Sequence, residues 1–197
     1  MARKREFDEE VVLETAKNLF WKKGYNAVST QDLIDAFGIS KSSMYGAFKD
    51  KKSLFKLALK HYTHNTSEKM IAILNENNSF QQTIHGILQQ LVKENMCDAE
   101  SKGCFMVNTA IELAPHDEEI LTIVQQNRKN IIAAISKAIQ KGIDVKELSE
   151  KNDPEALANY FYTLINGLRV EGKVVKDQKS YDDTLKIALR SIITTTD

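Results

Sequence analysis

The chain has 197 residues, of which 42% are apolar and 27% charged, a composition typical of a globular protein with its own hydrophobic core. Two cysteines are too few for a disulfide framework, and no apolar run approaches the roughly 18 residues that a membrane span requires. The net charge is zero, but residues 1–60 hold 12 Lys and Arg against 8 Asp and Glu, which suggests a polyanionic partner for that part.

Apolar residues recur every three or four positions almost throughout, which predicts an all-α fold of about nine helices. The first predicted helix has an apolar stripe over residues 12–20. Two very short helices follow, capped by Ser29 and Ser40, with Gly38 between them. A long helix then runs from residue 50 to about residue 74. The first part of the chain is therefore one helix, two very short helices and one long helix.

Longer helices fill the remainder. The apolar pattern predicts them at residues 80–92, 103–114, 117–140, 153–175 and 181–195. Asp153 followed by Pro154 is a strong start signal, because a capping side chain precedes a proline at the first helical position. Gly142 is predicted to close the helix that begins near residue 117, and Ser180 is predicted to cap the last one.

Residues 29–52 have the pattern of a helix-turn-helix. The first helix of the pair brings apolar side chains to a core, and Gly38 can reverse the chain because glycine tolerates positive φ. Met44 and Phe48 lie four positions apart and should pack inward from the second helix. The opposite face of that helix would then be free to meet a ligand.

That outward face is short, rich in hydroxyl groups and basic. Its members are Lys41, Ser42, Ser43, Tyr45 and Lys49. Such a face suits the base edges and phosphates of a DNA major groove. Lys51 and Lys52 should lie against backbone phosphates, as should the amides that follow Ser29 and Ser40. From these residues alone, a helical hairpin whose charges meet only water remains the alternative.

The stretch from Phe7 to Leu57 resembles the DNA-binding domain of the tetracycline-repressor (TetR) family of bacterial regulators. The matching residues are Ala16, Leu19, Phe20, Gly24, Tyr25, Ser29, Asp32, Leu33, Gly38, Ile39, Ser40, Tyr45, Phe48, Lys51, Leu54 and Phe55. The resemblance implies a repressor of transcription that binds a double-stranded DNA operator. Together, the pattern and the resemblance predict DNA contacts from Ser29, Thr30, Ser40, Lys41, Ser42, Ser43, Tyr45, Lys49 and Lys51.

Two positions depart from the family pattern. Gly46 and Ala47 stand where a bulky aromatic residue or histidine often follows the tyrosine, so we expect one common phosphate contact to be missing. Ile34 stands where alanine is usual, and its larger side chain should change the packing angle between the two short helices. These residues do not identify the operator.

The resemblance also implies two domains and a homodimer. The DNA-binding domain would occupy residues 1–50, a linking helix about 51–75, and an effector-binding and dimerisation domain 76–197. The helices at 153–175 and 181–195 would pair with their copies, which places two recognition helices about one DNA turn (~34–36 Å) apart on a palindromic operator. Burial of the same apolar stripes within one subunit is the alternative from the residues alone.

The helix at residues 103–114 is the predicted wall of an effector pocket. Cys104, Asn108 and Glu112 are four positions apart on one stripe, and Phe105 lies among apolar neighbours. Such a stripe would give a mostly apolar pocket a few polar anchors. The alternative is a polar face that meets only solvent. We expect an unidentified small molecule to bind there and release the protein from its operator.

Cys104 offers a second trigger. It lies in the first turn of the predicted helix beside Lys102, where the helix dipole and the positive charge would favour its reactive thiolate form. Some members of the resembled family respond to electrophiles or oxidants through a cysteine at a similar glycine–cysteine step. Cys97 is a possible disulfide partner. A buried, inert thiol is the alternative.

Rival classes are an all-α enzyme and a helical ligand carrier that does not bind DNA. His61, His64 and Glu68 share a helix face at a spacing seen in metal sites, but no further ligand accompanies them. No nucleophile elbow or phosphate loop is present, so we expect no catalytic residue, metal or cofactor. Met1 is not followed by a signal-peptide pattern, and we expect a cytoplasmic protein without membrane contact.

Overall fold

The computed structural model describes residues 7–76 and 78–192, and in these residues the protein contains helices and no β-strand. The α-helices are α1 (Glu9–Lys23), α2 (Thr30–Phe37), α3 (Lys41–Phe48), α4 (Lys51–Asn75), α5 (Phe80–Cys97), α6 (Phe105–Glu112), α7 (Glu118–Asp144), α8 (Pro154–Glu171) and α9 (Gln178–Leu189). A short 3₁₀ helix, η1 (Ala114–His116), precedes α7. The all-α prediction of about nine helices is confirmed. None of the helices in these residues is long and apolar enough to span a membrane.

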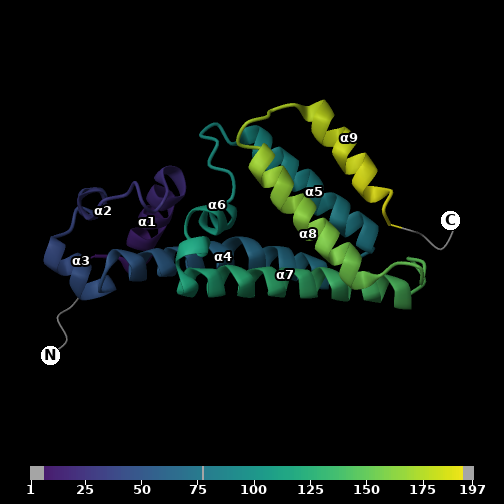
Figure 1. The fold of residues 1–197 in the computed structure, drawn as a ribbon, viewed down its shortest axis with the longest axis horizontal. Coiled ribbons are helices and arrows are strands. Elements are labelled where there is room, and N and C mark those ends of the chain that lie inside the picture. Colours follow the sequence, from purple (N-terminus) through teal and green to yellow (C-terminus); the bar gives the residue numbers. More distant parts are fainter. Residues whose placement is uncertain (1–6, 77, 193–197) are drawn as a thin grey trace.

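The long helices α4 and α7 lie side by side along the molecule (Figure 1). Helices α1, α2 and α3 gather at one end of this pair, and α5, α8 and α9 cover the other end. The short α6 lies between the two groups. Because α4 begins among the first group and ends in the second, it is the rigid element that joins them.

Local capping explains most of the helix starts. Eight helices begin after an Asp or Ser whose side chain accepts a hydrogen bond from a backbone N–H of the first turn, namely Asp8, Ser29, Ser40, Asp50, Ser79, Asp117, Asp153 and Asp177. A cap of this kind is worth about 1 kcal/mol and defines the first residue of the helix. The exception is α6, whose N-cap residue Cys104 makes no capping hydrogen bond.

The ends of α5 and α8 lie at Cys97 and Glu171 rather than at the predicted residues 92 and 175, and four further predicted boundaries are also wrong. Gly142 does not close α7 but lies inside it, because the helix continues to Asp144. The side chain of Leu148 packs onto Gly142, and a Cβ there would lie 3.0 Å from it. The last helix begins after Asp177, three residues before the predicted cap Ser180. It ends at Leu189, so the predicted continuation to residue 195 is wrong as well.

The remaining error concerns α6, which begins at Phe105 rather than at residue 103. Gly103 has φ +64°, a left-handed conformation that cannot continue an α-helix. Helix α6 ends at Glu112, and the predicted stop Pro115 follows it inside the 3₁₀ helix η1. The shorter α6 leaves residues 98–104 as an irregular segment next to the cavity described below.

Buried apolar residues form two clusters. The head core combines buried side chains of α1, α2, α3 and the first half of α4 with Cys104, Phe105, Met106, Leu113 and Ile120. The body core combines the end of α4 with α5, α7, α8 and α9. Residues of α6 thus pack with the head although they follow α5 in the chain. The division into residues 1–50 and 76–197 stays a prediction.

Candidate DNA-binding surface and effector pocket

The turn between α2 and α3 is held by local hydrogen bonds. Ser29 and Asp32 form a reciprocal capping box at the start of α2. At its end Gly38 adopts a left-handed conformation, with φ +64°, and its N–H donates to the Ile34 carbonyl at 3.0 Å. Ser40 then caps α3 by accepting a hydrogen bond from the Ser43 N–H at 3.1 Å. The two short helices are therefore placed relative to each other by residues within a single stretch of sequence.

Helix α3 has an inward and an outward face, as predicted. Met44 and Phe48 are buried in the head core, with 1% and 3% exposure. Lys41, Ser42, Tyr45 and Lys49 are exposed, and Ser43 is half-buried. We call these last five residues the α3 surface. Its apolar anchors hold the helix against the head, so the α3 surface remains open to a partner.

The chemistry of the α3 surface is a hydroxyl cluster flanked by lysines. The Ser40 hydroxyl lies 2.9 Å from the hydroxyls of both Ser42 and Ser43 at the start of the helix. Each hydroxyl can donate one hydrogen bond and accept two, so the cluster keeps capacity for an oxygen-rich ligand. Lys41 and Tyr45 lie one turn apart on the same side, with the ammonium nitrogen 6.0 Å from the ring centroid. Such groups can bind phosphate oxygens and base edges.

The two lysines that begin α4 differ in their surroundings. The Lys51 ammonium lies 4.2 Å from the centre of the Tyr25 ring, and desolvation lowers the pKa of this half-buried side chain. Lys52 forms ion pairs with Asp117 at 2.7 Å and Glu119 at 2.6 Å. In this structure two carboxylates, from α7 and its cap, bind the Lys52 ammonium, and its expected contact with DNA phosphates stays a prediction.

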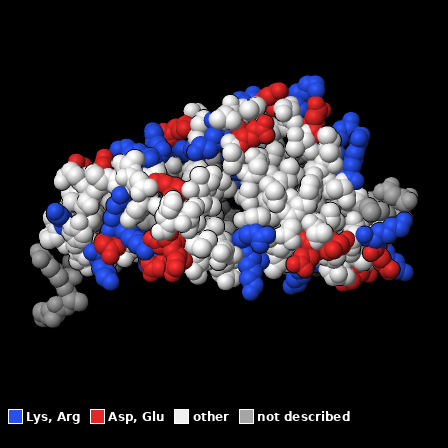
Figure 2. Space-filling view, in the orientation of Figure 1, with Lys and Arg blue, Asp and Glu red and all other residues white. Residues whose placement is uncertain are grey.

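The remaining predicted DNA contacts lie at the start of α2. Ser29 is exposed and Thr30 is half-buried in the first turn. The Ser29 hydroxyl hydrogen-bonds to the Asp32 carboxylate, so part of its capacity serves the capping box. Figure 2 shows acidic and basic side chains interspersed over the face in view, with no broad basic patch.

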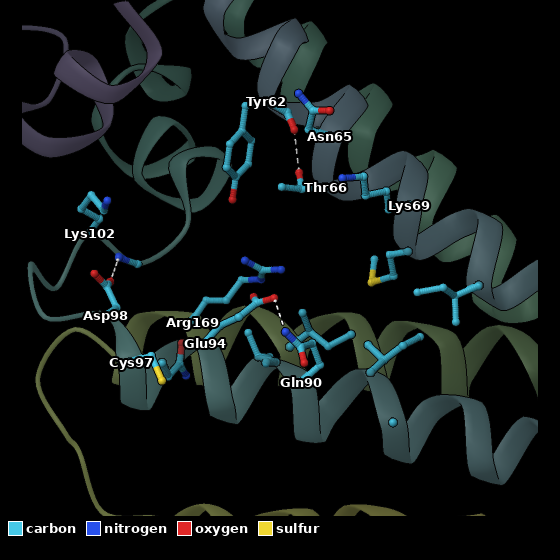
Figure 3. A pocket seen from close by; sticks show the side chains of 18 of the residues that line it. Tyr62, Asn65, Thr66, Lys69, Gln90, Glu94, Cys97, Asp98, Lys102 and Arg169 are labelled. Carbon is cyan, nitrogen blue, oxygen red and sulfur yellow. Dashed lines mark hydrogen bonds between the residues drawn. The ribbon is translucent and has the colours of Figure 1, made fainter. Parts of the chain in front are cut away.

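A cavity of about 1220 Å³ opens between α4, α5, α8 and the segment after α5 (Figure 3). Apolar side chains form much of its wall, including Met70 and Ile73 from α4, Ile87 from α5 and Ile165 from α8. Trp21 reaches it from α1. A largely apolar cavity of this size with a few polar groups is typical of a small-molecule site.

The predicted effector residues lie beside this cavity rather than in its wall. Cys104 and Phe105 are buried in the head core. The Asn108 amide donates to the Lys102 carbonyl at 2.9 Å and accepts from the Lys173 ammonium at 3.2 Å. None of the three lines the cavity, although Gly103 does. The structure therefore brings them near the cavity without exposing them to it.

Glu112 faces the head instead of the cavity. Its carboxylate accepts hydrogen bonds from the backbone N–H groups of Tyr25 at 3.0 Å and Asn26 at 2.8 Å, in the turn that follows α1. A Cβ on Gly24 would lie 3.0 Å from the same carboxylate, so a glycine is required for this approach. Glu112 thus fastens the end of α6 to the DNA-binding helices.

Sequence reasoning missed the polar residues of the cavity wall, among them Tyr62 and Arg169. The Tyr62 hydroxyl donates to the Cys104 sulfur at 3.3 Å, and burial raises the pKa of Tyr62 so that it keeps its proton. Arg169 follows the buried Ile165 by four positions and Phe161 by eight. A charged residue in the register of a buried stripe was the signal that could have identified it.

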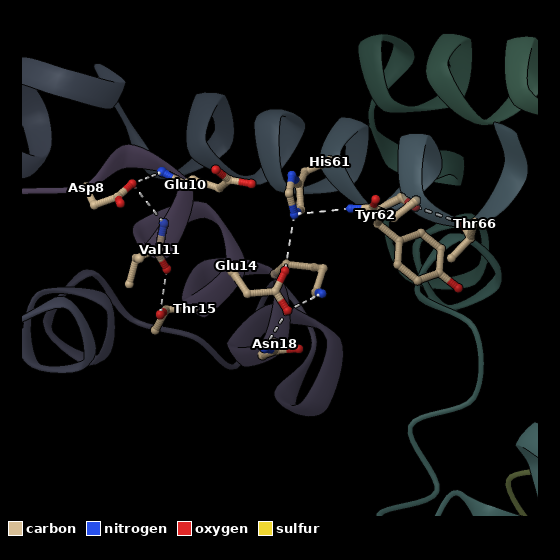
Figure 4. A network of polar contacts seen from close by, with 11 residues as sticks. Asp8, Glu10, Val11, Glu14, Thr15, Asn18, His61, Tyr62 and Thr66 are labelled. Carbon is tan, nitrogen blue, oxygen red and sulfur yellow. Dashed lines mark hydrogen bonds and ion pairs between the residues drawn. The ribbon is translucent and has the colours of Figure 1, made fainter. Parts of the chain in front are cut away.

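The predicted histidine face does not converge on one point. The His61 ring lies 3.2 Å from the Glu14 carboxylate, which also accepts from Asn18 and pairs with Lys17 (Figure 4). The hydrogen bond from Lys17 is the main reason that the pKa of Glu14 is lowered. His64 instead contacts Glu68 at 2.6 Å. Over residues 7–76 and 78–192, no three metal-ligating side chains come together.

Family models and relatives of known type match both the DNA-binding part and the remainder of the chain. A family model described as bacterial regulatory proteins, tetR family, matches residues 12–58, and one described as tetracyclin repressor-like, C-terminal domain, matches residues 79–188. The regulator YezE of Bacillus subtilis is 30% identical over 190 residues, 96% of this chain and 98% of that protein. The repressor ComR of Escherichia coli is 24% identical, covering 87% and 82%. A CifR cysteine mutant, solved with 26-bp operator DNA, has TM-score 0.85 and 27% identity, covering 97% and 100%.

Proposed function

The chain belongs to the TetR family of bacterial transcriptional regulators, and from that premise we propose that it is a repressor released from a palindromic operator by a small molecule. The observation that carries this proposal is the α3 surface, which is exposed and rich in hydroxyl and lysine groups while Met44 and Phe48 anchor it. CifR, of similar fold, was solved on operator DNA, which supports the same mode of binding here.

We propose that the operator-bound form is a homodimer joined through α8 and α9. Apolar side chains on these helices are exposed in the single chain, among them Tyr160 at 39%, Val170 at 45% and Ile187 at 66%. Gly167 has no atom within 4 Å of the position of a Cβ, so another helix could approach it closely. A two-fold dimer would present two α3 surfaces to the two halves of a palindrome.

The release step follows from the contacts between head and body. A ligand in the cavity touches the middle of α4, whose first turn is tied to α7 by the ion pairs of Lys52. The cavity also borders the segment before α6. Glu112, at the end of α6, binds the turn after α1. A ligand that favours a different placement of α4 or α6 would move the heads of the dimer apart or together, and DNA would disfavour that ligand reciprocally.

Selection of DNA from a random pool, followed by fluorescence anisotropy on the enriched duplex, tests the proposal. We expect a palindromic consensus and an affinity that falls steeply with salt, because lysine–phosphate contacts release counterions. Joint replacement Lys41→Ala and Tyr45→Ala should weaken binding by about tenfold or more. Lys93→Ala, an exposed lysine on α5, is the matched control and should have no effect. Equal loss in both variants, or no enriched sequence, refutes the proposal.

A thiol switch at Cys104 is the second candidate. It rests on the surroundings of the sulfur, which accepts a hydrogen bond from the Tyr62 hydroxyl at 3.3 Å and neighbours the Arg169 guanidinium. The Cys104 thiol would add to the C=C bond of N-ethylmaleimide. An S–C bond forms, and the proton of the thiol moves to the adjacent carbon. If the switch operates, the reagent abolishes operator binding in the parent protein and in Cys97→Ser, but not in Cys104→Ser.

We further propose that the protein is not an enzyme and that it acts in the cytoplasm, where the bacterial chromosome lies. Both statements rest on its membership of a family of regulators. A helical carrier without DNA binding is the remaining rival, and the selection experiment above separates it from a repressor because a carrier would enrich no sequence.

A further inference from the structure

The charged side chains around the cavity are unevenly partnered. Six line it, and four of them have partners: Lys102 with Glu100, Glu100 also with Lys22, Asp98 with the Gly103 N–H, and Glu94 with the Gln90 amide. The other two, Lys69 and Arg169, have no ion pair among the residues that the structure describes. Both are cations, whereas the two carboxylates that lack a cationic partner, Glu94 and Asp98, accept hydrogen bonds from the Gln90 amide and the Gly103 N–H.

Arg169 is the more significant of the two because it lies deeper. Its guanidinium projects into the cavity between the side chains of Tyr62 and Glu94 (Figure 3), and over the described ranges no carboxylate oxygen comes within 4.0 Å of it. Desolvation opposes its charge, and the Glu94 carboxylate is among the groups that favour it. A guanidinium in low-dielectric surroundings without a carboxylate partner has a strong preference for an anion.

A second unsatisfied group in the wall has the same polarity. The Trp21 Nε1–H is the one buried side-chain polar atom without a hydrogen-bond partner in the described part of the chain, and it is a donor. Lys69, exposed on α4, adds a cation on the opposite wall. Arg169 and Lys69 thus bring cations to the cavity, whereas Met70, Ile87 and Ile165 make part of its surface apolar.

We infer that the effector is an amphipathic acid, whose carboxylate binds Arg169 while its apolar part packs between α4, α5 and α8. The fork of the guanidinium matches a carboxylate in two parallel hydrogen bonds. This inference rests on the proposed role of the cavity as the effector site. Glu94 bears a charge of the same sign as the ligand and should weaken its binding, which gives the site an internal control.

Intrinsic fluorescence tests the inference directly, because Trp21 is the single tryptophan of the chain and lines the cavity. Two matched pairs of probes separate charge from shape: decanoate with 1-decanol, and 4-phenylbutyrate with 4-phenyl-1-butanol. We expect at least one acid to bind with an affinity about tenfold or more above that of its alcohol. If neither acid exceeds its alcohol, the inference is wrong.

Variants locate the anion subsite. Arg169→Met should remove the preference for the acid while leaving the alcohol affinity unchanged, and Glu94→Gln should strengthen acid binding. Arg169→Lys keeps a cation and should keep part of the preference, so the series is decisive even if Arg169→Met does not fold, as circular dichroism will show. Acid preference that persists in Arg169→Met, or is lost in Glu94→Gln, overturns the assignment.

Operator binding is measured separately by anisotropy on the selected duplex without probe. If the parent protein binds no DNA but still prefers the acid, the proposed function fails while the anion subsite stands. If the parent binds DNA and shows no acid preference, the reverse holds.

Discussion

The α3 surface and the cavity are assembled in different ways. The residues of the α3 surface lie on one short helix with a cap at its start, or, for Lys49, directly after its last residue. The cavity collects side chains from Trp21 on α1 to Arg169 on α8. A surface on one helix is specified by its own spacing of three and four residues, whereas a cavity exists only after several helices have packed.

The boundary between head and body is crossed at α6. Phe105 packs its ring against Phe55 and Tyr62, with centroid distances of 5.4 Å and 5.7 Å. Glu112, one helix length further, binds the turn after α1. A short helix that follows α5 in the chain thus belongs to the head core. The comparison teaches that the two sites can communicate through packing that no local pattern reveals.

The largest expected effect tests whether α6 belongs to the head core. Phe105→Ala removes a side chain that is 2% exposed, and we expect a loss of about 3–5 kcal/mol in the free energy of unfolding. Ile111→Ala, on the same helix but 67% exposed, is the control and should change that free energy by about 0.5 kcal/mol at most. Urea denaturation measures both. Equal midpoints would show that α6 is not packed as described.

Gly172 and Gly46 differ in the space around the position that a Cβ would occupy. A Cβ on Gly172, at the end of α8, would lie 2.3 Å from the Asn95 amide, whose nitrogen donates to the Leu168 carbonyl at 2.8 Å. Gly172→Ala should therefore cost about 1–3 kcal/mol. Gly46 on α3 has nothing within 4 Å, so Gly46→Ala should stabilise by about 0.5–1 kcal/mol. Thermal unfolding decides, and two shifts of the same sign would contradict the contrast.

Lys51 and Lys41 are expected to differ in what they contribute to stability. Lys51→Ala removes the ammonium over the Tyr25 ring and should cost about 0.5–1 kcal/mol of stability. Lys41→Ala should leave stability unchanged and reduce the slope of log affinity against log salt by about one. Chemical denaturation and salt titrations of operator binding measure the two quantities. A stability loss in Lys41→Ala would indicate that α3 is held partly by its outward face.

The smallest effect concerns pH and the capping box of α2. The Ser29 hydroxyl and N–H, with Lys23, hold the pKa of Asp32 well below its usual range. A lowered pKa in the folded state stabilises above the unfolded value of about 3.9, and this contribution is lost as the pH falls toward the folded value. The stability difference between the parent protein and Asp32→Asn should be constant near neutral pH and shrink below about pH 4. A difference independent of pH down to 2 would contradict it.

Much of the fold follows from local chemistry. The sequence predicted the caps Ser29, Ser40, Asp50 and Asp153, because an Asp or Ser side chain directly before a helical pattern can accept a hydrogen bond from a backbone N–H of the first turn. The errors at Gly142 and Ser180 have the same origin: glycine and serine also occur inside helices when packing or an earlier cap decides the boundary. The glycine at position 142 does not mark a helix end. It leaves room for the side chain of Leu148, which would lie 3.0 Å from a Cβ there.

The sequence by itself determined the helices, the helix-turn-helix with its inward and outward faces, and the family, because all of these depend on residues a few positions apart. Only the tertiary structure decided that Glu112 binds the turn after α1, that Lys52 is engaged by Asp117 and Glu119, and that Arg169 enters the cavity. The period of a helix tells which residues share a face. It does not tell which other helix that face meets, since that depends on packing between segments far apart in the chain.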